Sequence, residues 1–463
     1  MKARLLLKVF CWFVVACVAA VVGLYLTALF VNRNDKPPSA TVVRFEEMGS
    51  KLPPVVEQDN GYVYFMGLSA AKESDPAVVG TQRITWTQAQ LAKPLAASVG
   101  DIPDKNRVAR VERIPVIDQL FTQCVVADLV CASALKNNEA KIEAWMVREE
   151  WFSERYRKLL SFPAWREMLQ FDGRLPLPTY TELYEGHRML LLDAWLRAGR
   201  GDVAGVKKVL ADDIRFWRRN IAQNDTLIAK MISAGALQRH FTWSNIILRR
   251  LPVARQAEAI PVEWRVPITD AERSMLRPFV GEWRYFVGEI RLAKAGAVLD
   301  LSESDDSLDA ALQRNLAKNF LQVQATSNRQ AARMAEGARA LSVDYPQLPA
   351  AAQRVRSLQE NSGMGLLEHG VYNVLGNVFT GAGGWDMTKY ALRIADLEGV
   401  RRAALLTAEL RSQGVSVEQV QAQLAKSAGS PYDGKPFSWS EDAQSVVFRG
   451  LAEGKFAQTL VLY

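Results

Sequence analysis

The chain has 463 residues, 49% of them hydrophobic, and a formal net charge of +7, which falls to +4 without Lys2, Arg4 and Lys8. A charge this small and this dispersed does not predict nucleic-acid binding, which needs a clustered basic face. The strongest basic cluster, 215–219, lies in a helical pattern whose apolar stripe includes Trp217, so we expect a solvated helix face there.

The first element is an apolar run over Val9–Val31, 23 consecutive residues without a charge. A helix of this length rises about 34 Å, which is enough to cross a hydrocarbon core of about 30 Å. Three cations precede the run, whereas Asp35 offsets one of the two that follow it, so the positive-inside bias places the amino terminus in the cytoplasm. We expect a cytoplasmic tip over 1–8, one transmembrane helix over 9–31 in a bacterial inner membrane, and a periplasmic body.

Two other fates stay open for this segment. The sequence Val14-Val15-Ala16-Cys17 resembles a bacterial lipobox, in which Cys17 would carry a lipid, although apolar residues rather than a polar tether follow it. A cleaved signal peptide would have an apolar region of only about 7 to 15 residues. Because the apolar run continues to Val31, we favour an uncleaved anchor.

Residues 32–137 are predicted to form a linker followed by a mixed α/β segment. The linker, 32–58, is polar and is marked by Pro37-Pro38 and Pro53-Pro54. The mixed segment, 59–137, opens with a strand predicted over 60–68 from its aromatic and β-forming residues, and we expect irregular, partly β structure over 69–115.

Cys124 and Cys131 are the two cysteines outside the apolar run, and an oxidising compartment favours their pairing. On a straight helix these positions would lie about 10 Å apart, too far for a disulfide, so pairing requires a loop or turn between them. The alternative is a pair of buried thiols on one helix face. Two cysteines alone lack the ligand number of a structural zinc site.

From residue 138 onward, apolar residues at 3- and 4-residue spacing predict helices. We expect two helical subdomains, 138–255 and 256–463, the second ending in a β-hairpin with strands over 445–448 and 458–463. A Gly201-Asp202 turn separates two helices in a hairpin of the tetratricopeptide type, but no second copy appears at a period near 34 residues. Further helices are predicted over 271–293, 307–320, 327–341, 348–360 and 386–412.

The predicted fold is therefore mainly α. It has an N-terminal transmembrane helix, a globular body rich in helical hairpins, and small β elements at both ends of that body.

No catalytic, cofactor-binding or metal-binding constellation is predicted. The three histidines, His187, His240 and His369, are far apart and none has a metal-ligand spacing. We expect His187 and His240 to be surface or capping residues. His369 follows Glu368 in a glycine-marked turn, and this pair is the least implausible site if the chain is an enzyme.

Two other patterns have ordinary structural explanations. A glycine loop over 380–384 precedes a helix and would suit an anion, but Asp386 would repel phosphate and is expected to cap that helix. Adjacent carboxylates such as Asp212-Asp213 point about 100° apart on a helix, so they do not form an acid–base dyad.

The carboxyl-terminal end combines a long helix carrying 397–402 (Leu-Glu-Gly-Val-Arg-Arg), the element 430–439 (Ser-Pro-Tyr-Asp-Gly-Lys-Pro-Phe-Ser-Trp) and a strand. Over roughly the last 65 residues it resembles the helix and Asp-Pro, Gly, Pro hairpin that ends many uncharacterised, membrane-anchored bacterial proteins. Ser430-Pro431 stands where that pattern has Asp-Pro. The resemblance implies an extracytoplasmic location and no particular activity.

Together these patterns favour a non-enzymatic interaction or scaffold protein of the cell envelope, with the membrane and a protein as its partners and no cofactor. An envelope enzyme acting on peptidoglycan or lipid through a dispersed site is one alternative. An effector-neutralising immunity protein is another, with the same architecture and a different partner.

Overall fold

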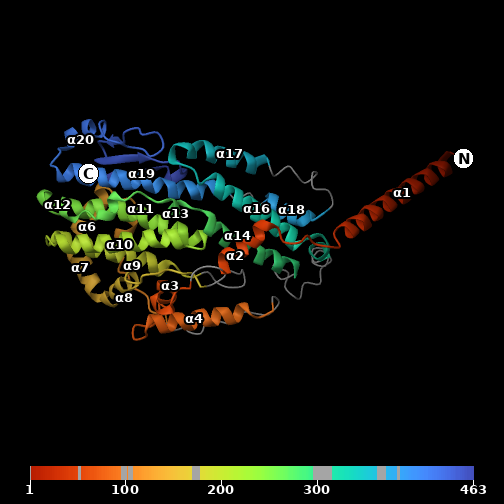
Figure 1. Cartoon of the computed structure of the whole chain (residues 1–463), viewed down its shortest axis with the longest axis horizontal. Helices are drawn as coiled ribbons and strands as arrows, with labels where there is room; N and C mark the ends of the chain where they lie inside the picture. Colours follow the sequence, from red (N-terminus) through yellow and green to blue (C-terminus); the bar gives the residue numbers. More distant parts are fainter. Residues whose placement is uncertain are drawn as a thin grey trace.

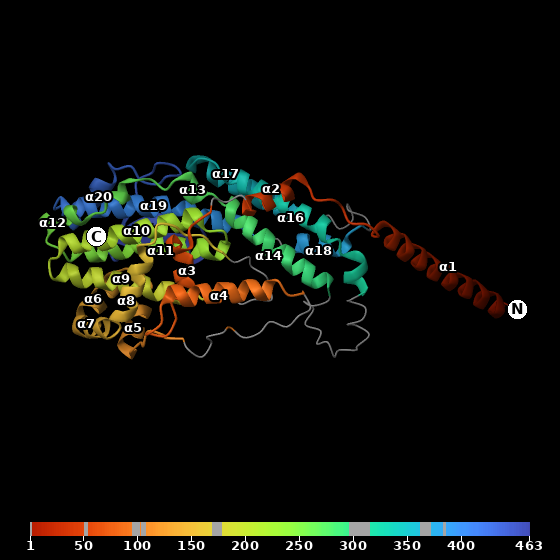
Figure 2. The same cartoon turned by 60° about the horizontal axis from the view of Figure 1, so that its bottom comes forward.

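The computed structural model describes residues 2–50, 54–94, 102, 108–168, 178–295, 315–361, 372–382 and 386–463. The chain is mainly helical with a few small strands near the carboxyl terminus, as the sequence predicts (Figure 1). Helix α1 (Lys2–Val31) projects from one end of the elongated body, and the carboxyl terminus lies toward the other end (Figure 2).

Helix α1 contains one segment, Phe10–Val31, that is long and apolar enough to cross a membrane. Its side chains are exposed from Phe10 to Thr27, and Trp12 keeps 74% of its surface. Near the body, the ring of Tyr25 meets that of Phe320 at 5.8 Å between centroids. An apolar helix exposed on all sides is favoured in an apolar environment and not in water.

The prediction of a linker over 32–58 is wrong for the central part of that range, because helix α2 (Ala40–Ser50) lies there. Val42 and Phe45, three residues apart, are both buried, and Phe45 packs edge-on against Trp283 with 5.5 Å between ring centroids. This short amphipathic helix packs on α16 (Val323–Ala340). The segment that follows α1 is therefore part of the body, since the burial of those two side chains stabilises the packing of this helix.

The strand predicted over 60–68 is also wrong: Gly61–Met66 form helix α3. Tyr62, Tyr64 and Phe65 are all buried. This apolar run is therefore a helix that is surrounded by the core, and not a strand with one buried face. Asn60 caps the helix by accepting a 3.1 Å hydrogen bond from the amide of Tyr62.

The rest of the predicted mixed segment, where it is described, consists of helices joined by turns and loops, with an isolated bridge between Ala70 and Val108. Its helices are α4 (Pro76–Leu91), α5 (Pro115–Gln123) and α6 (Leu129–Asn137). Helix α4 packs closely on α3 because Gly80 of α4 and Gly67, directly after α3, lie at the contact. A Cβ on Gly80 would lie 1.8 Å from the carbonyl oxygen of Val63, so no larger residue fits there.

The helices predicted from residue 138 onward are present where the structure describes them, and the first part of the helix predicted over 307–320 lies outside the described residues. The first of these helices are α7 (Glu139–Arg148), α8 (Glu150–Leu160), α9 (Thr181–Gly199), α10 (Val203–Gln223) and α11 (Leu227–Arg249). Gly201 adopts a left-handed φ of 72° in the turn after α9, and Asp202 caps α10 by accepting a 2.8 Å hydrogen bond from the amide of Gly205. The predicted helix, Gly-Asp turn, helix arrangement is confirmed.

The carboxyl-terminal half adds further helices around the same core. They are α12 (Val253–Ala259), the 3₁₀ turn η2 (Val262–Arg265), α13 (Asp270–Arg273), α14 (Leu276–Lys294), α16, α17 (Leu348–Asn361), α18 (Val374–Ala382), α19 (Met387–Ser412) and α20 (Val417–Leu424). The proposed subdomain division at 255–256 falls inside α12, and α11 and α19 from its two sides pack together in one hydrophobic core.

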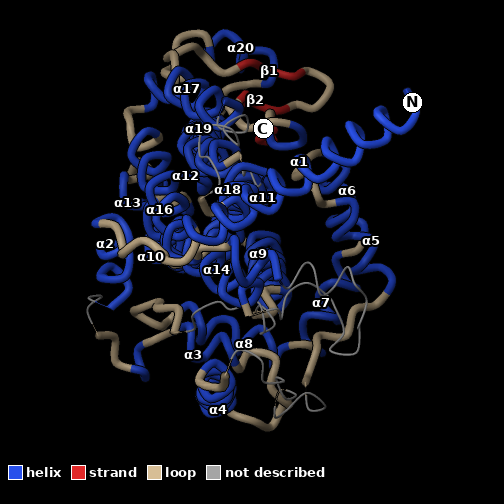
Figure 3. The backbone as a smooth tube through the Cα atoms, turned by 90° about the vertical axis from the view of Figure 1, so that its right-hand side faces the viewer, coloured by secondary structure: helices blue, strands red, loops and turns tan. Residues whose placement is uncertain are grey.

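A three-stranded antiparallel sheet closes the fold, in the order β1 (Ser438–Ser440), β2 (Ser445–Arg449) and β3 (Gln458–Leu462). Figure 3 shows β1 and β2 at one margin of the body beside α20, with α4 at the opposite margin. Phe448 of β2 lies against Gly399 of α19, where a Cβ would come 2.1 Å from the ring, so glycine is required. The predicted strands 445–448 and 458–463 correspond to β2 and β3.

Candidate functional site

His187 and His240, expected at the surface or at helix ends, are instead fully buried, so that prediction is wrong. They lie on α9 and α11 and meet at Asp213 of α10. Asp386 does cap α19, accepting a 3.1 Å hydrogen bond from the amide of Thr388. Glu368 and His369 lie outside the described residues, as does part of the 380–384 loop.

Asp213 is the centre of this buried cluster. Its Oδ2 lies 3.1 Å from Nε2 of His187 and 2.7 Å from Nδ1 of His240, and all three side chains are fully buried. The helix spacing explains the position of the carboxylate. Asp213 follows Leu210 by three residues and precedes Trp217 by four, so it belongs to the apolar stripe of α10 that faces the core.

The neighbours of the two imidazoles determine where their protons lie. The Trp264 indole N–H can only donate, and it lies 2.8 Å from Nε2 of His240, so that nitrogen accepts and the proton of His240 is on Nδ1. The Arg239 guanidinium likewise only donates, at 3.4 Å from Nδ1 of His187. Each ring is therefore neutral and donates its single N–H to Asp213.

The electrostatics agree with this assignment. Burial lowers the pKa of His187, against the opposing attraction of Asp213. Burial alone would raise the pKa of Asp213, but the two imidazole donors offset it and hold the pKa below its ordinary value. Burial lowers the pKa of Arg239 to about 10, so it remains a cation near neutral pH. The cluster is an aspartate anion and an arginine cation joined through His187.

This arrangement joins helices through His187, His240 and Asp213, which are all buried. All four imidazole nitrogens have partners within the protein, and a side chain with no exposed surface cannot be reached by a ligand in this conformation. Such a network holds α9, α10, α11 and η2 in one arrangement. Over the described part of the chain, no group of three or more His, Cys, Asp or Glu side chains could hold a metal ion.

A different kind of surface lies on α5 and α6. Cys124 and Cys131 form a disulfide, with 4.6 Å between their Cα atoms, because α5 ends at Gln123 and a turn separates it from α6. Val125 and Val130 stand exposed beside it at 79% and 59%.

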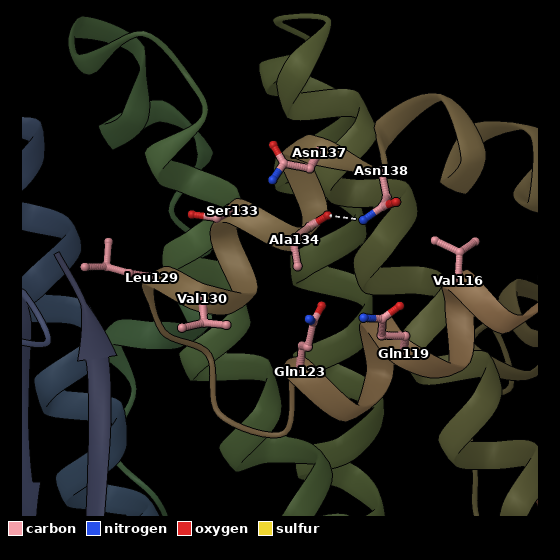
Figure 4. A pocket seen from close by; sticks show the side chains of 9 residues that line it. All are labelled: Val116, Gln119, Gln123, Leu129, Val130, Ser133, Ala134, Asn137 and Asn138. Carbon is pink, nitrogen blue, oxygen red and sulfur yellow. Dashed lines mark hydrogen bonds between the residues drawn. The ribbon is translucent and has the colours of Figure 1, made fainter.

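These helices enclose a surface cavity of about 470 Å³ (Figure 4). Its lining contains apolar, hydroxyl and amide side chains and no charge: Val116, Gln119, Gln123, Leu129, Val130, Ser133, Ala134, Asn137 and Asn138. The disulfide thus fixes a neutral, partly apolar surface.

The base of α1 carries a third polar cluster. Asn32, directly after α1, accepts a 2.7 Å hydrogen bond on its side-chain oxygen from the amide of Asn373. The Asn373 side chain in turn accepts from the amide of Gln322 at 2.8 Å and donates to Thr326 at 2.9 Å. Asp35 accepts from two amides at the start of α16, at 2.7 and 2.9 Å. Residues 32–35 are thereby bound to the body.

Comparison of the chain with protein-family models, with curated proteins and with solved structures gives no match. Function therefore has to be inferred from the geometry of the chain itself.

Proposed function

We propose that this chain is a single-pass protein of a bacterial inner membrane whose periplasmic body binds another envelope protein and has no enzymatic role. The length and apolar exposure of α1 support the anchor. The cations Lys2, Arg4 and Lys8 ahead of it support a cytoplasmic amino terminus. The Cys124–Cys131 disulfide supports a body in an oxidising compartment.

The observation that carries the interaction role is the neutral α5–α6 surface. Val130 is exposed in the lining of the uncharged cavity, and Val125 is exposed next to Cys124 of the disulfide. Exposed apolar side chains cost free energy in water, and this cost is relieved when a partner covers them. The partner that fits is a protein with an uncharged, partly apolar face. This face would contact the valine and amide side chains of the cavity, whose lining has no charged side chain. The disulfide limits the entropy lost on binding, because the turn is already ordered.

A photo-crosslinking amino acid at Val125 or Val130 in intact cells tests this role. We expect a discrete crosslinked protein from both positions. Val262 is the matched control, because it is a valine of similar exposure, 65%, on η2. Equal crosslinking from Val262, or none from Val125 and Val130, would contradict the proposal.

The location is tested separately with alkaline phosphatase, which is active only after export to an oxidising compartment. We expect activity when the enzyme is fused after Tyr463, and loss of activity when Lys2, Arg4 and Lys8 are moved to follow Val31. Activity of a cytoplasmic reporter at the same position would exclude a periplasmic body.

A further inference from the structure

A second cavity, of about 430 Å³, lies where the body meets the base of α1. Its walls come from the segment after α1, from α16 and from the start of α18, and these helices lie beside the base of α1 (Figure 1). Asn373 in its wall is hydrogen-bonded to Asn32, one residue beyond the end of α1. If α1 crosses a membrane, this contact places the cavity at the level of the lipid headgroups.

The polar groups of the cavity suit an anion. Lys36 and Arg329 line it together with the amides of Asn328 and Asn377. The described residues that line it include no acid. Asp35, the nearest acid in sequence, has both carboxylate oxygens engaged by amides of α16.

A third cation lies next along α16. Arg333 is four residues from Arg329, so the two guanidinium groups share one helix face. Arg329 donates a hydrogen bond to the side-chain oxygen of Asn377 on α18, and Arg333 donates one to the backbone carbonyl oxygen of Thr380 on the same helix. Burial lowers the pKa of Arg329, and the charge of Arg333 acts in the same direction. Two cations held this close without an acid in the lining favour an anionic ligand.

The side chains of the cavity are also positioned before any ligand arrives. Arg329 is fixed by Asn377, whose own amide donates to the carbonyl oxygen of Tyr372 at 3.2 Å. Lys36 lies over the Tyr372 ring, with its ammonium 5.3 Å from the ring centroid. Arginine in a fixed position presents paired donors that match phosphate oxygens, and lysine adds a point charge.

We propose that this cavity binds the phosphate of an anionic phospholipid headgroup at the membrane surface, with Lys36 and Arg329 as its main contacts. The proposal rests on α1 being a membrane span, as inferred above. Binding would hold the body at a defined height and orientation on the membrane, because residues 32–35 are bound to the same helices.

The test uses the full-length chain in a neutral detergent and measures bound lipid by native mass spectrometry. The probes are short-chain phosphatidylglycerol, short-chain phosphatidylcholine and inorganic phosphate. We expect adducts with phosphatidylglycerol in excess over phosphatidylcholine. The double variant K36Q/R329Q should bind phosphatidylglycerol about 25-fold more weakly, since each cation near an anionic lipid contributes about fivefold.

Two matched variants make the result specific. K136Q/R449Q removes two exposed cations on α6 and at the end of β2, and should leave binding unchanged. R329K keeps the charge but loses the paired donors, and should bind with an intermediate affinity. An unchanged melting temperature of lipid-free K36Q/R329Q shows that the loss is local.

Equal adducts with both lipids, or unchanged binding by K36Q/R329Q, would overturn the proposal. Displacement of phosphatidylglycerol by inorganic phosphate at equal concentration would assign the cavity to free phosphate and overturn the lipid assignment. Because binding is measured in detergent, it is independent of topology. The alkaline phosphatase fusion therefore reports separately on failure of the proposed function.

Discussion

The Asp213 cluster and the cavity at the base of α1 are built from similar polar groups and use them in opposite ways. In the core, every imidazole nitrogen around Asp213 meets another group of the protein, and no surface is left for a ligand. At the base of α1, asparagines bind the backbone while Lys36 and Arg329 line a surface cavity of about 430 Å³.

The difference lies in charge balance and access. Asp213 and Arg239 are opposite charges linked through His187, so the charges of the core cluster balance internally, although Oδ1 of Asp213 has no hydrogen-bond partner. The cations in the cavity lining have no acid in that lining to balance them. A polar cluster thus indicates a binding site when it is both open and unbalanced in charge.

The largest expected effect is that of Asp213→Ala. It leaves two imidazole N–H groups without their acceptor and Arg239 without its anion, at a cost of about 3–5 kcal/mol in the free energy of unfolding. Asp212→Ala is the matched control, because Asp212 is partly exposed and pairs with Lys208 and Arg215 at the surface, so a loss of about 0–1 kcal/mol is expected. Denaturant titration followed by tryptophan fluorescence measures both. Equal losses would remove the distinction between a closed core network and surface ion pairs.

The second effect concerns the α5–α6 surface. Replacing Cys124 and Cys131 together by serine removes a cross-link that closes a short loop, with an expected cost of about 2–3 kcal/mol. Hydrogen exchange should quicken in α5 and α6 and stay unchanged in α9–α11. The pair Cys11 and Cys17, replaced in the same way, should change neither region because both are exposed on α1. Faster exchange throughout the body would show that the disulfide supports the whole fold.

The third effect separates backbone strain from hydrogen bonding at the base of α1. Asn373 has a left-handed φ of 53°, which glycine adopts freely and alanine does not. Asn373→Gly loses the side-chain bonds to Gln322 and Thr326, and Asn373→Ala adds about 1 kcal/mol of strain. We expect hydrogen exchange in α16 and α18 to quicken in both variants and more in the alanine variant. Unchanged exchange in the glycine variant would mean that the side-chain bonds do not hold this turn, and equal exchange in the two variants would mean that backbone strain does not matter there.

The smallest effect is a pH dependence from the core cluster. The pKa of His187 is lowered on folding, so the unfolded chain binds the proton more readily and stability falls as pH decreases through about 6.5. Burial lowers the pKa of His187, and so do the charges of Arg239 and His240, whereas Asp213 raises it. The slope from one proton is at most about 1.4 kcal/mol per pH unit. The melting temperatures at pH 7.5 and pH 5.5 should differ less for His187→Gln than for the original chain. An equal difference in both proteins would mean that a group other than His187 causes the pH dependence.

Much of the helical body follows from local pattern. The stripes of α9, α10 and α11 and the Gly201-Asp202 turn were readable because helix periodicity and capping depend on residues within a few positions. The same signal misled at 60–68, where Tyr62, Tyr64 and Phe65 are buried together in a short helix. An aromatic run buried on every side has no period, so a strand and a helix look alike there.

The candidate sites were much less predictable. One usable signal for the core cluster was present: Asp213, three residues after Leu210 and four before Trp217, is a charged residue within an apolar stripe. A charge in such a position needs a buried partner. Its partners, His187 and His240, lie 26 and 27 residues away on other helices, and no spacing within one helix reveals them.

The sequence by itself determined the apolar run of α1, the helical class of the body and the need for a turn between Cys124 and Cys131, because these depend on composition and short-range geometry. Tertiary structure alone decided that the segment after α1 is bound to α16 and α18, through contacts such as Asn32 with Asn373, 341 residues apart. It also decided which polar groups are buried and satisfied and which line a cavity. Hydrogen-bond partners are chosen by proximity in space, and only the packing of whole helices brings such distant residues together.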